Sequence, residues 1–158
     1  MNATKTRQYR IIAKILFWIY IGFVFYFLLI SEIYGRTGEM QEYHYNFVLF
    51  QEIMRFWNYR EQLGIFPVFA NLAGNILIFI PFGFFVPMSR ERKSILATTI
   101  GAFLLSLVIE SIQLYTRVGC FDVDDLLLNT LGGVTGYIIF TTSYWMRRDY
   151  GEKRRKRS

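Results

Sequence analysis

Residues 11–30 read IIAKILFWIYIGFVFYFLLI, an apolar run that only Lys14 interrupts, close to its start. An α-helix needs about 20 predominantly apolar residues to cross about 30 Å of hydrocarbon. The run has this length, and it is not followed by the small-residue cleavage site that ends a secretory signal peptide. We therefore expect a retained helix that spans a membrane.

The rest of the chain has the same apolar character. Of the 158 residues, 53% are hydrophobic and 19% are aromatic, which is more than a soluble domain of this length shows. Three further apolar stretches of spanning length lie at about 64–88, 95–115 and 126–146. The sequence thus predicts an all-α polytopic membrane protein with four transmembrane helices, forming one domain over residues 1–158.

The distribution of positive charge predicts the orientation. Lys and Arg are concentrated in residues 1–14, 89–93 and 147–158, which hold 14 of the 18 basic residues. Such an excess marks the cytoplasmic side of a membrane, so we expect both termini in the cytoplasm. A basic tail directly after a span favours contact with anionic lipid, and no nucleic-acid partner is expected.

Polar side chains recur at helical spacing inside three of the predicted spans. They are Asn71 and Asn75; Glu110, Gln113 and Arg117; and Asp122, Asp125 and Asn129. Each set falls on one helix face. Gly74 beside the two asparagines is expected to permit a close approach of a second helix. A polar side chain inside a membrane requires a partner, so each face is a candidate site.

The depth of these faces predicts that they meet. At 1.5 Å per residue, Asn75, Glu110 and Asn129 all lie about 6–15 Å below the outer surface. We expect one polar cavity open to the exterior, with Arg117 and the aspartates at its rim. Two structural alternatives stay open: one aspartate is the N-cap of the fourth helix, and Glu110 bonds Arg117, Asn75 or Asn129 to fix the packing.

The first outer loop carries a further pattern. Within residues 45–64, Phe47, Phe50, Met54 and Trp57 recur at helical spacing. This pattern predicts a short amphipathic helix at the membrane surface. Such a helix would cover the polar cavity and bring Arg55 or Arg60 toward it.

Three ordered motifs carry a resemblance to a known family. They are NFVLFQEIMRF at 46–56, NLAGNILIFIPFGFFVP at 71–87 and IESIQLYTRVGCFDVDDLLLNTLGG at 109–133. Together they resemble the VanZ-like family of bacterial membrane proteins, over about residues 45–137. Leu49 stands where the family frequently has a proline.

The resemblance implies a protein of the bacterial plasma membrane, and its name-giving member is associated with low-level resistance to the glycopeptide teicoplanin. The motif positions of the family fall on Asn71, Asn75, Glu110, Gln113, Asp122, Asp124, Asp125 and Asn129. These positions include those that the depth comparison selects.

We weigh three functions for this cavity. The first is binding of a cell-envelope lipid head group, another lipid-linked envelope component or an amphiphilic lipoglycopeptide, by the motif residues together with Arg55 and Arg117. The second is an enzyme acting on a phosphate- or sugar-bearing lipid. The third is a proton-coupled transporter, in which Glu110 would carry the proton.

The enzyme alternative assigns definite roles. Glu110, Asp122 and Asp125 would be the catalytic residues, with Glu110 as general acid or base. Asp122, Asp124 and Asp125 would hold a divalent cation through their oxygen atoms. The sequence does not decide the oligomeric state.

Overall fold

The structure is a computed structural model that describes residues 3–27, 43–117 and 119–155. Its elements are α1 (Ala3–Phe25), β1 (His44–Asn46), α3 (Gln51–Asn58), α4 (Arg60–Leu63), α5 (Ile65–Ser89), α6 (Ile95–Thr116), β2 (Cys120–Asp122) and α7 (Val123–Arg155). Within the described residues, four helices are long and apolar enough to cross a membrane: α1, α5, α6 and α7. The predicted all-α fold with four spanning helices is confirmed.

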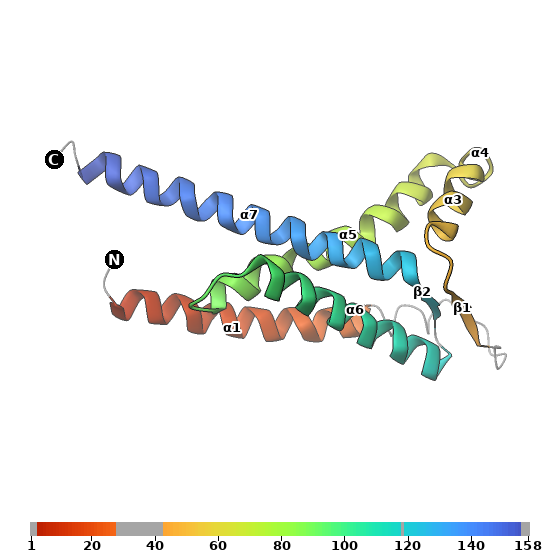
Figure 1. The fold of residues 1–158 in the computed structure, drawn as a ribbon, viewed down its shortest axis with the longest axis horizontal. Coiled ribbons are helices and arrows are strands. Elements are labelled where there is room, and N and C mark those ends of the chain that lie inside the picture. The colour runs from red at the N-terminus through yellow and green to blue at the C-terminus, as the bar shows by residue number, and fades with distance from the viewer. Residues whose placement is uncertain (1–2, 28–42, 118, 156–158) are drawn as a thin grey trace.

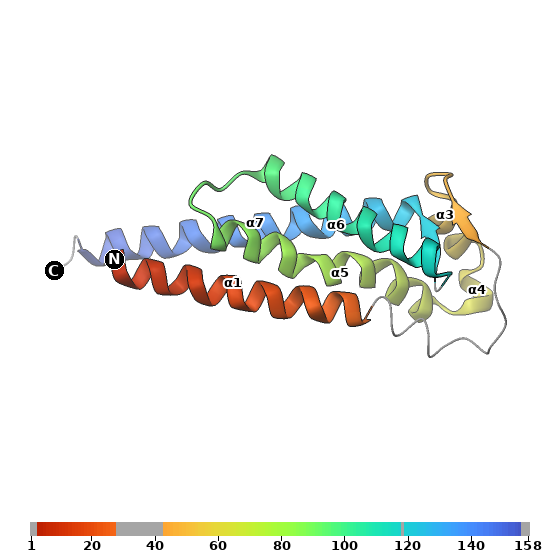
Figure 2. The same ribbon diagram turned by 90° about the horizontal axis from the view of Figure 1, so that it is seen from below.

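The long helices form an elongated bundle in which α5 lies between the others (Figures 1 and 2). Helix α5 packs most extensively against α7 and also contacts α1 and α6, and α6 packs against α7. The buried core includes Val24 of α1, Phe79 and Phe82 of α5, and Ala102 and Ile109 of α6. Many large apolar side chains remain exposed on the outside of the bundle, as expected for a lipid-facing surface.

Glycine residues bring α5 and α7 into close contact. A side chain at Gly132 or Gly136 would collide with the carbonyl oxygen of Ile76 or Ile80, one turn apart on α5. This is the small-residue spacing that lets membrane helices approach one another. The same role predicted for Gly74 is wrong, because a Cβ atom there would meet nothing within 4 Å.

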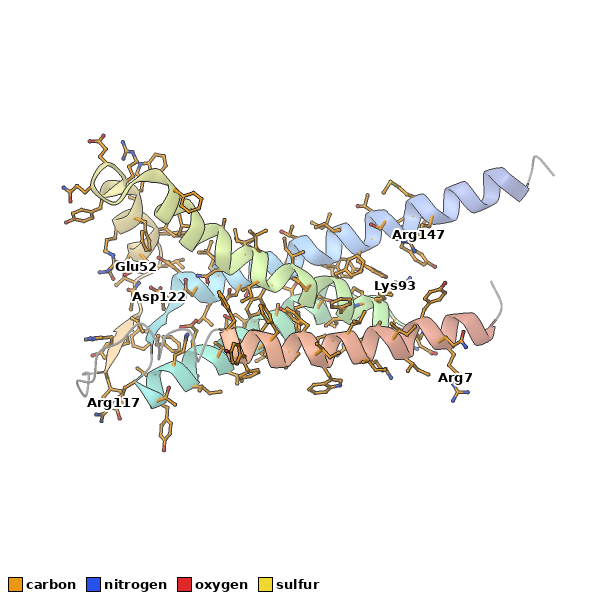
Figure 3. The ribbon with its side chains drawn as sticks, turned by 180° about the vertical axis from the view of Figure 1, so that it is seen from behind. Arg7, Glu52, Lys93, Arg117, Asp122 and Arg147 are labelled. Carbon is orange, nitrogen blue, oxygen red and sulfur yellow. The ribbon has the colours of Figure 1, made fainter. Side chains whose placement is uncertain are left out.

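The end of the bundle that carries the two termini is basic. Arg7, Lys93 and Arg147 lie toward this end, whereas Glu52 and Asp122 lie at the opposite end (Figure 3). The ammonium group of Lys93 lies 3.1 Å from the centroid of the Tyr144 ring. Helix α7 continues past the predicted span into the basic segment and ends at Arg155.

The opposite end is closed by short elements, of which the hydrophobic pattern predicts the surface helix but not the two strands. Strands β1 and β2 pair in parallel, with Asn46 opposite Asp122. The amphipathic helix predicted within residues 45–64 is present as α3, but it begins only at Gln51, after Phe47 and Phe50. Tyr45 and Asn46 belong to β1 instead. Ladder hydrogen bonds to β2 replace helical ones over these residues, since β1 pairs with the chain that leads into α7.

Candidate functional site

The paired strands place a buried asparagine against an aspartate. The Nδ2 atom of Asn46 donates to Oδ1 of Asp122 at 3.2 Å. The Oδ1 atom of Asn46 accepts the backbone N–H of Val48 at 2.9 Å, which forms a local Asx turn. Asn46 therefore ties the start of the surface loop to the base of α7.

Asp122 is the N-cap of α7. Its Oδ1 atom accepts the backbone N–H of Asp124 at 2.8 Å, and its own backbone N–H donates to Oε2 of Glu110 at 3.1 Å. The prediction that one aspartate caps the fourth helix is confirmed. Glu110 is only 3% exposed, and it joins the middle of the bundle to this cap.

Asp124 stabilises a second helix end, that of α3. Its Oδ1 atom accepts the N–H of Phe50 at 2.5 Å, and its Oδ2 atom accepts the N–H groups of Glu52 and Ile53 at 2.9 and 3.2 Å. Phe50 has a left-handed φ of 66°, which is strained for a bulky residue and is held by this bond. The carboxylate lies at the positive end of α3 and fixes it over the bundle.

Asp125 and Asn129 have separate partners one turn apart on α7. Nδ2 of Asn75 donates to Oδ1 of Asp125, which confirms that α5 and α7 bring these polar faces together. Nδ2 of Asn129 donates to Oγ of Ser106 at 2.9 Å, deeper in the bundle. In the part of the chain that the structure describes, Oδ1 of Asn129 is buried with no hydrogen-bond partner.

Above these residues lies a polar recess of about 680 Å³, between the short elements and the ends of α5, α6 and α7. Its lining is Tyr43, His44, Tyr45, Asn46, Gln51, Glu52, Arg55, Phe56, Leu72, Gln113, Gly119, Cys120, Asp122, Asp124, Asp125 and Leu128. The volume falls in the range of small-molecule sites. Five predicted site residues line it: Arg55, Gln113, Asp122, Asp124 and Asp125.

The recess is electrostatically unfavourable for its own acids. Burial raises the pKa of Asp122, and the charge of Asp124 raises it further, although hydrogen bonds from Asp124 and Asn46 oppose the rise. Burial also raises the pKa of Glu52, while Arg55 lowers it. The guanidinium of Arg55 lies 2.6 Å from the Glu52 carboxylate, so α3 brings one cation into the recess as predicted.

Two arginines predicted near the cavity are absent from the lining of the recess. Arg117 ends α6 with a left-handed φ of 56°, so it does not extend the helical face of Glu110 and Gln113. Its guanidinium lies 4.3 Å from the centroid of the Tyr43 ring. Arg60 lies over the ring of Trp57. Asn71 belongs to α5, but its side chain lies outside the described residues.

The sequence patterns did not identify Asn46 and Glu52 as site residues. Glu52 lies within the segment predicted as a surface helix, and its side chain lines the recess, near Asp122 and Asp124. Asparagine often accepts the backbone N–H two residues later in an Asx turn, and Asn46 does so with Val48. This tendency was the signal in the sequence that could have identified Asn46.

The structure gives no support for a metal site on the three aspartates. Among residues 3–27, 43–117 and 119–155, no group of three or more His, Cys, Asp or Glu side chains is arranged to hold a metal ion. Asp124 shows the physical reason, because its oxygen atoms accept three backbone N–H groups.

Comparison with known proteins identifies the family. The model of the VanZ/LLP1 family matches residues 17–145. The chain is 30% identical over 103 residues to Protein VanZ of Enterococcus faecium, and the match covers 61% of this chain and 64% of that protein. The chain therefore spans less than two thirds of that relative's length. No solved structure matches the chain significantly. Since the family match covers most of the chain, this membrane protein belongs to the VanZ/LLP1 family.

Proposed function

We propose that the polar recess binds the head group of a cell-envelope lipid or of an amphiphilic antibiotic, and that this binding contributes to teicoplanin resistance. The observation that carries the proposal is the recess itself, about 680 Å³ in volume and lined by converging polar groups at one end of a membrane bundle. Concave sites with a few convergent polar groups are the usual form of small-molecule sites.

The proposal includes an orientation in the bacterial plasma membrane. Strands β1 and β2 and helix α3, which contribute to the lining of the recess, lie at the end of the bundle away from both termini (Figure 1). Basic residues flank the spans at the terminal end, and such residues favour the cytoplasm. With the termini in the cytoplasm, the recess faces the outer leaflet, where the acyl tail of a lipoglycopeptide inserts.

The resistance part of the proposal comes from the relatives. The 30% identity to Protein VanZ covers 64% of that protein, and the resemblance to the family carries the association with teicoplanin. A protein that holds an amphiphile at the outer surface would act where this antibiotic meets the cell.

A susceptibility assay tests the proposal. The chain and its variants are expressed in a teicoplanin-susceptible bacterium, and the minimum inhibitory concentration is measured beside the amount of protein in the membrane. We expect Glu52→Gln and Asp125→Asn to lose the protection that the unmodified chain gives, because both residues line the recess.

Glu61→Gln is the matched control. Glu61 carries the same charge on α4, and its side chain is 87% exposed. It should leave protection unchanged. The proposal fails if the unmodified chain gives no protection, or if both recess variants protect fully at equal membrane levels.

A further inference from the structure

A second hollow adjoins the recess across strand β1. It is a groove of about 540 Å³ lined by Tyr43, Tyr45, Phe47, Ser111, Leu114 and Tyr115, and its surface is almost entirely apolar. Tyr43 and Tyr45 line both hollows. Ser111, Leu114 and Tyr115 of the groove wall belong to the last turns of α6, and Tyr115 is 84% exposed. The groove therefore lies beside the hydrocarbon that surrounds the bundle, while the recess beside it is polar.

The charge of the recess restricts what it can hold. Its lining contains four carboxylates, Glu52, Asp122, Asp124 and Asp125, against one guanidinium, that of Arg55. Counted at their formal charges, these five side chains sum to −3. A phosphate group there would meet net repulsion, whereas a cation would relieve the repulsion among the acids.

The size and geometry of the recess favour an organic cation over a metal ion. The recess has the volume of a small-molecule site, and its carboxylates are spread over α3, β2 and the first turn of α7 rather than gathered around one point. In the described part of the chain, no three acidic, histidine or cysteine side chains form a metal-binding group. An ammonium group is a compact donor of three hydrogen bonds, which suits acceptors arranged around a cavity.

We infer that the recess and the groove form one site for an amine-bearing amphiphile, with the ammonium group among the carboxylates of the recess and the alkyl chain along the aromatic groove. The inference rests on the proposed function and names its ligand class. Charge-assisted hydrogen bonds to Glu52 and Asp122 select the head group. Contact with Tyr45, Phe47 and Leu114 removes the chain from water and adds affinity in proportion to the apolar area covered.

Native mass spectrometry of the full chain in lipid nanodiscs tests this inference. The bilayer contains phosphatidylcholine, phosphatidylglycerol and lysine-esterified phosphatidylglycerol with identical acyl chains, so that only the head group differs, and only the lysine-esterified lipid carries ammonium groups with N–H donors. We expect the lysine-esterified lipid to be retained above its mole fraction. The double variant Glu52→Gln, Asp122→Asn removes both charged acceptors and should reduce its retention by at least about tenfold, since the loss of even one charged hydrogen bond has about that effect.

Two further variants provide a control for the recess and a test of the groove. Glu61→Gln removes an acid outside the recess and should leave retention unchanged. Ser111→Trp fills the groove and should lower the retention of all three lipids while leaving the order of head-group preference intact. Added teicoplanin distinguishes the source of the amphiphile. If teicoplanin displaces the bound lipid, the antibiotic binds the same site. If the lipid stays bound, the site is assigned to lipid.

The results separate the inference from the function on which it rests. Recess-dependent retention of phosphatidylglycerol or phosphatidylcholine would overturn the amine inference and keep the binding function. Retention that no recess variant changes would overturn both. A rise in melting temperature with Ca²⁺ or Mg²⁺ that Asp122→Asn abolishes would also overturn the inference, because the recess would then be a metal site.

Discussion

Asp124 shows how one side chain joins two distant parts of the fold. Its carboxylate accepts the N–H groups of Phe50, Glu52 and Ile53 at the N-terminus of α3. These three residues are separated from Asp124 by 71 to 74 positions in the chain. Replacement by alanine would leave three backbone N–H groups without this acceptor. We predict that Asp124→Ala lowers the free energy of unfolding by about 1–3 kcal/mol. Hydrogen exchange should accelerate at the amides of Glu52 and Ile53 while the α5–α7 core stays protected.

Glu61→Ala is the control for Asp124→Ala, because it removes a carboxylate from an exposed position next to the same surface helix. It should change neither stability nor exchange in α3. Unchanged protection of Glu52 and Ile53 in Asp124→Ala would show that α3 is held by other contacts.

Asp122 gives the protein a pH-dependent stability. Because its pKa is raised in the folded protein, the folded state keeps a proton that the unfolded chain releases. Stability therefore falls as the pH rises from the ordinary aspartate pKa through the raised one. We predict that Asp122→Asn, which keeps an oxygen acceptor for Asp124, flattens this fall in thermal unfolding measured across that pH range. Some slope should remain, since the pKa of Glu52 is also raised.

A pH profile of Asp122→Asn that is as steep as that of the unmodified protein would assign the dependence to other groups. Glu61→Gln, with the same loss of charge at an exposed site, should reproduce the unmodified profile.

At the scale of elements, the contact of α5 with α7 depends on glycines without room for a side chain. Adding a methyl group at Gly132 or Gly136 forces the α7 backbone away from the carbonyl oxygens of Ile76 and Ile80. We predict that Gly132→Ala and Gly136→Ala each destabilise the bundle by about 1–3 kcal/mol. Denaturant unfolding in micelles measures the change.

Gly74→Ala provides the matched control for these helix variants, because the added methyl group meets nothing within 4 Å. Its stability should stay the same or rise by about 0.5–1 kcal/mol, since alanine favours a helix over glycine. Equal losses in all three variants would refute the tight crossing.

The elements show which features the sequence can predict. The four long helices follow from apolar runs of spanning length, a property of composition alone. The close approach was assigned to Gly74 because it stands beside two asparagines, whereas the contact uses Gly132 and Gly136. Spacing along one helix shows which residues share a face, but it does not show which face meets the neighbouring helix.

The depth comparison grouped Asn75 with Glu110 and Asn129, but it did not identify the partners of these side chains. Asn75 bonds Asp125, which was expected at the rim, and Asn129 bonds Ser106. Contacts that depend on long-range pairing were hidden from the sequence. The pairing of β1 with β2 joins strands of three residues, which are too short to show a period of two. The bond from Asp124 to α3 links segments that local pattern cannot relate.

For the whole molecule, the two ends of the bundle differ in charge, and this difference predicts which end faces the exterior. The basic end carries the termini (Figure 1), and Glu52 and Asp122, which line the recess, lie at the other end (Figure 3). Cys120, the single cysteine, is exposed at the edge of the recess. We predict that a membrane-impermeant maleimide labels Cys120 on intact cells, since the positive-charge bias places this end outside.

The reactivity of Cys120 sets the conditions of that experiment. Burial and the surrounding carboxylates, foremost Asp122, raise the pKa of its thiol, so labelling should accelerate with pH as the thiolate forms. Cys120→Ser combined with Glu91→Cys moves the thiol to the opposite end, where Glu91 is 82% exposed. This variant should react only after the membrane is permeabilised. Labelling of Glu91→Cys on intact cells, with Cys120 protected, would place the recess in the cytoplasm and exclude an antibiotic in the outer leaflet as its ligand.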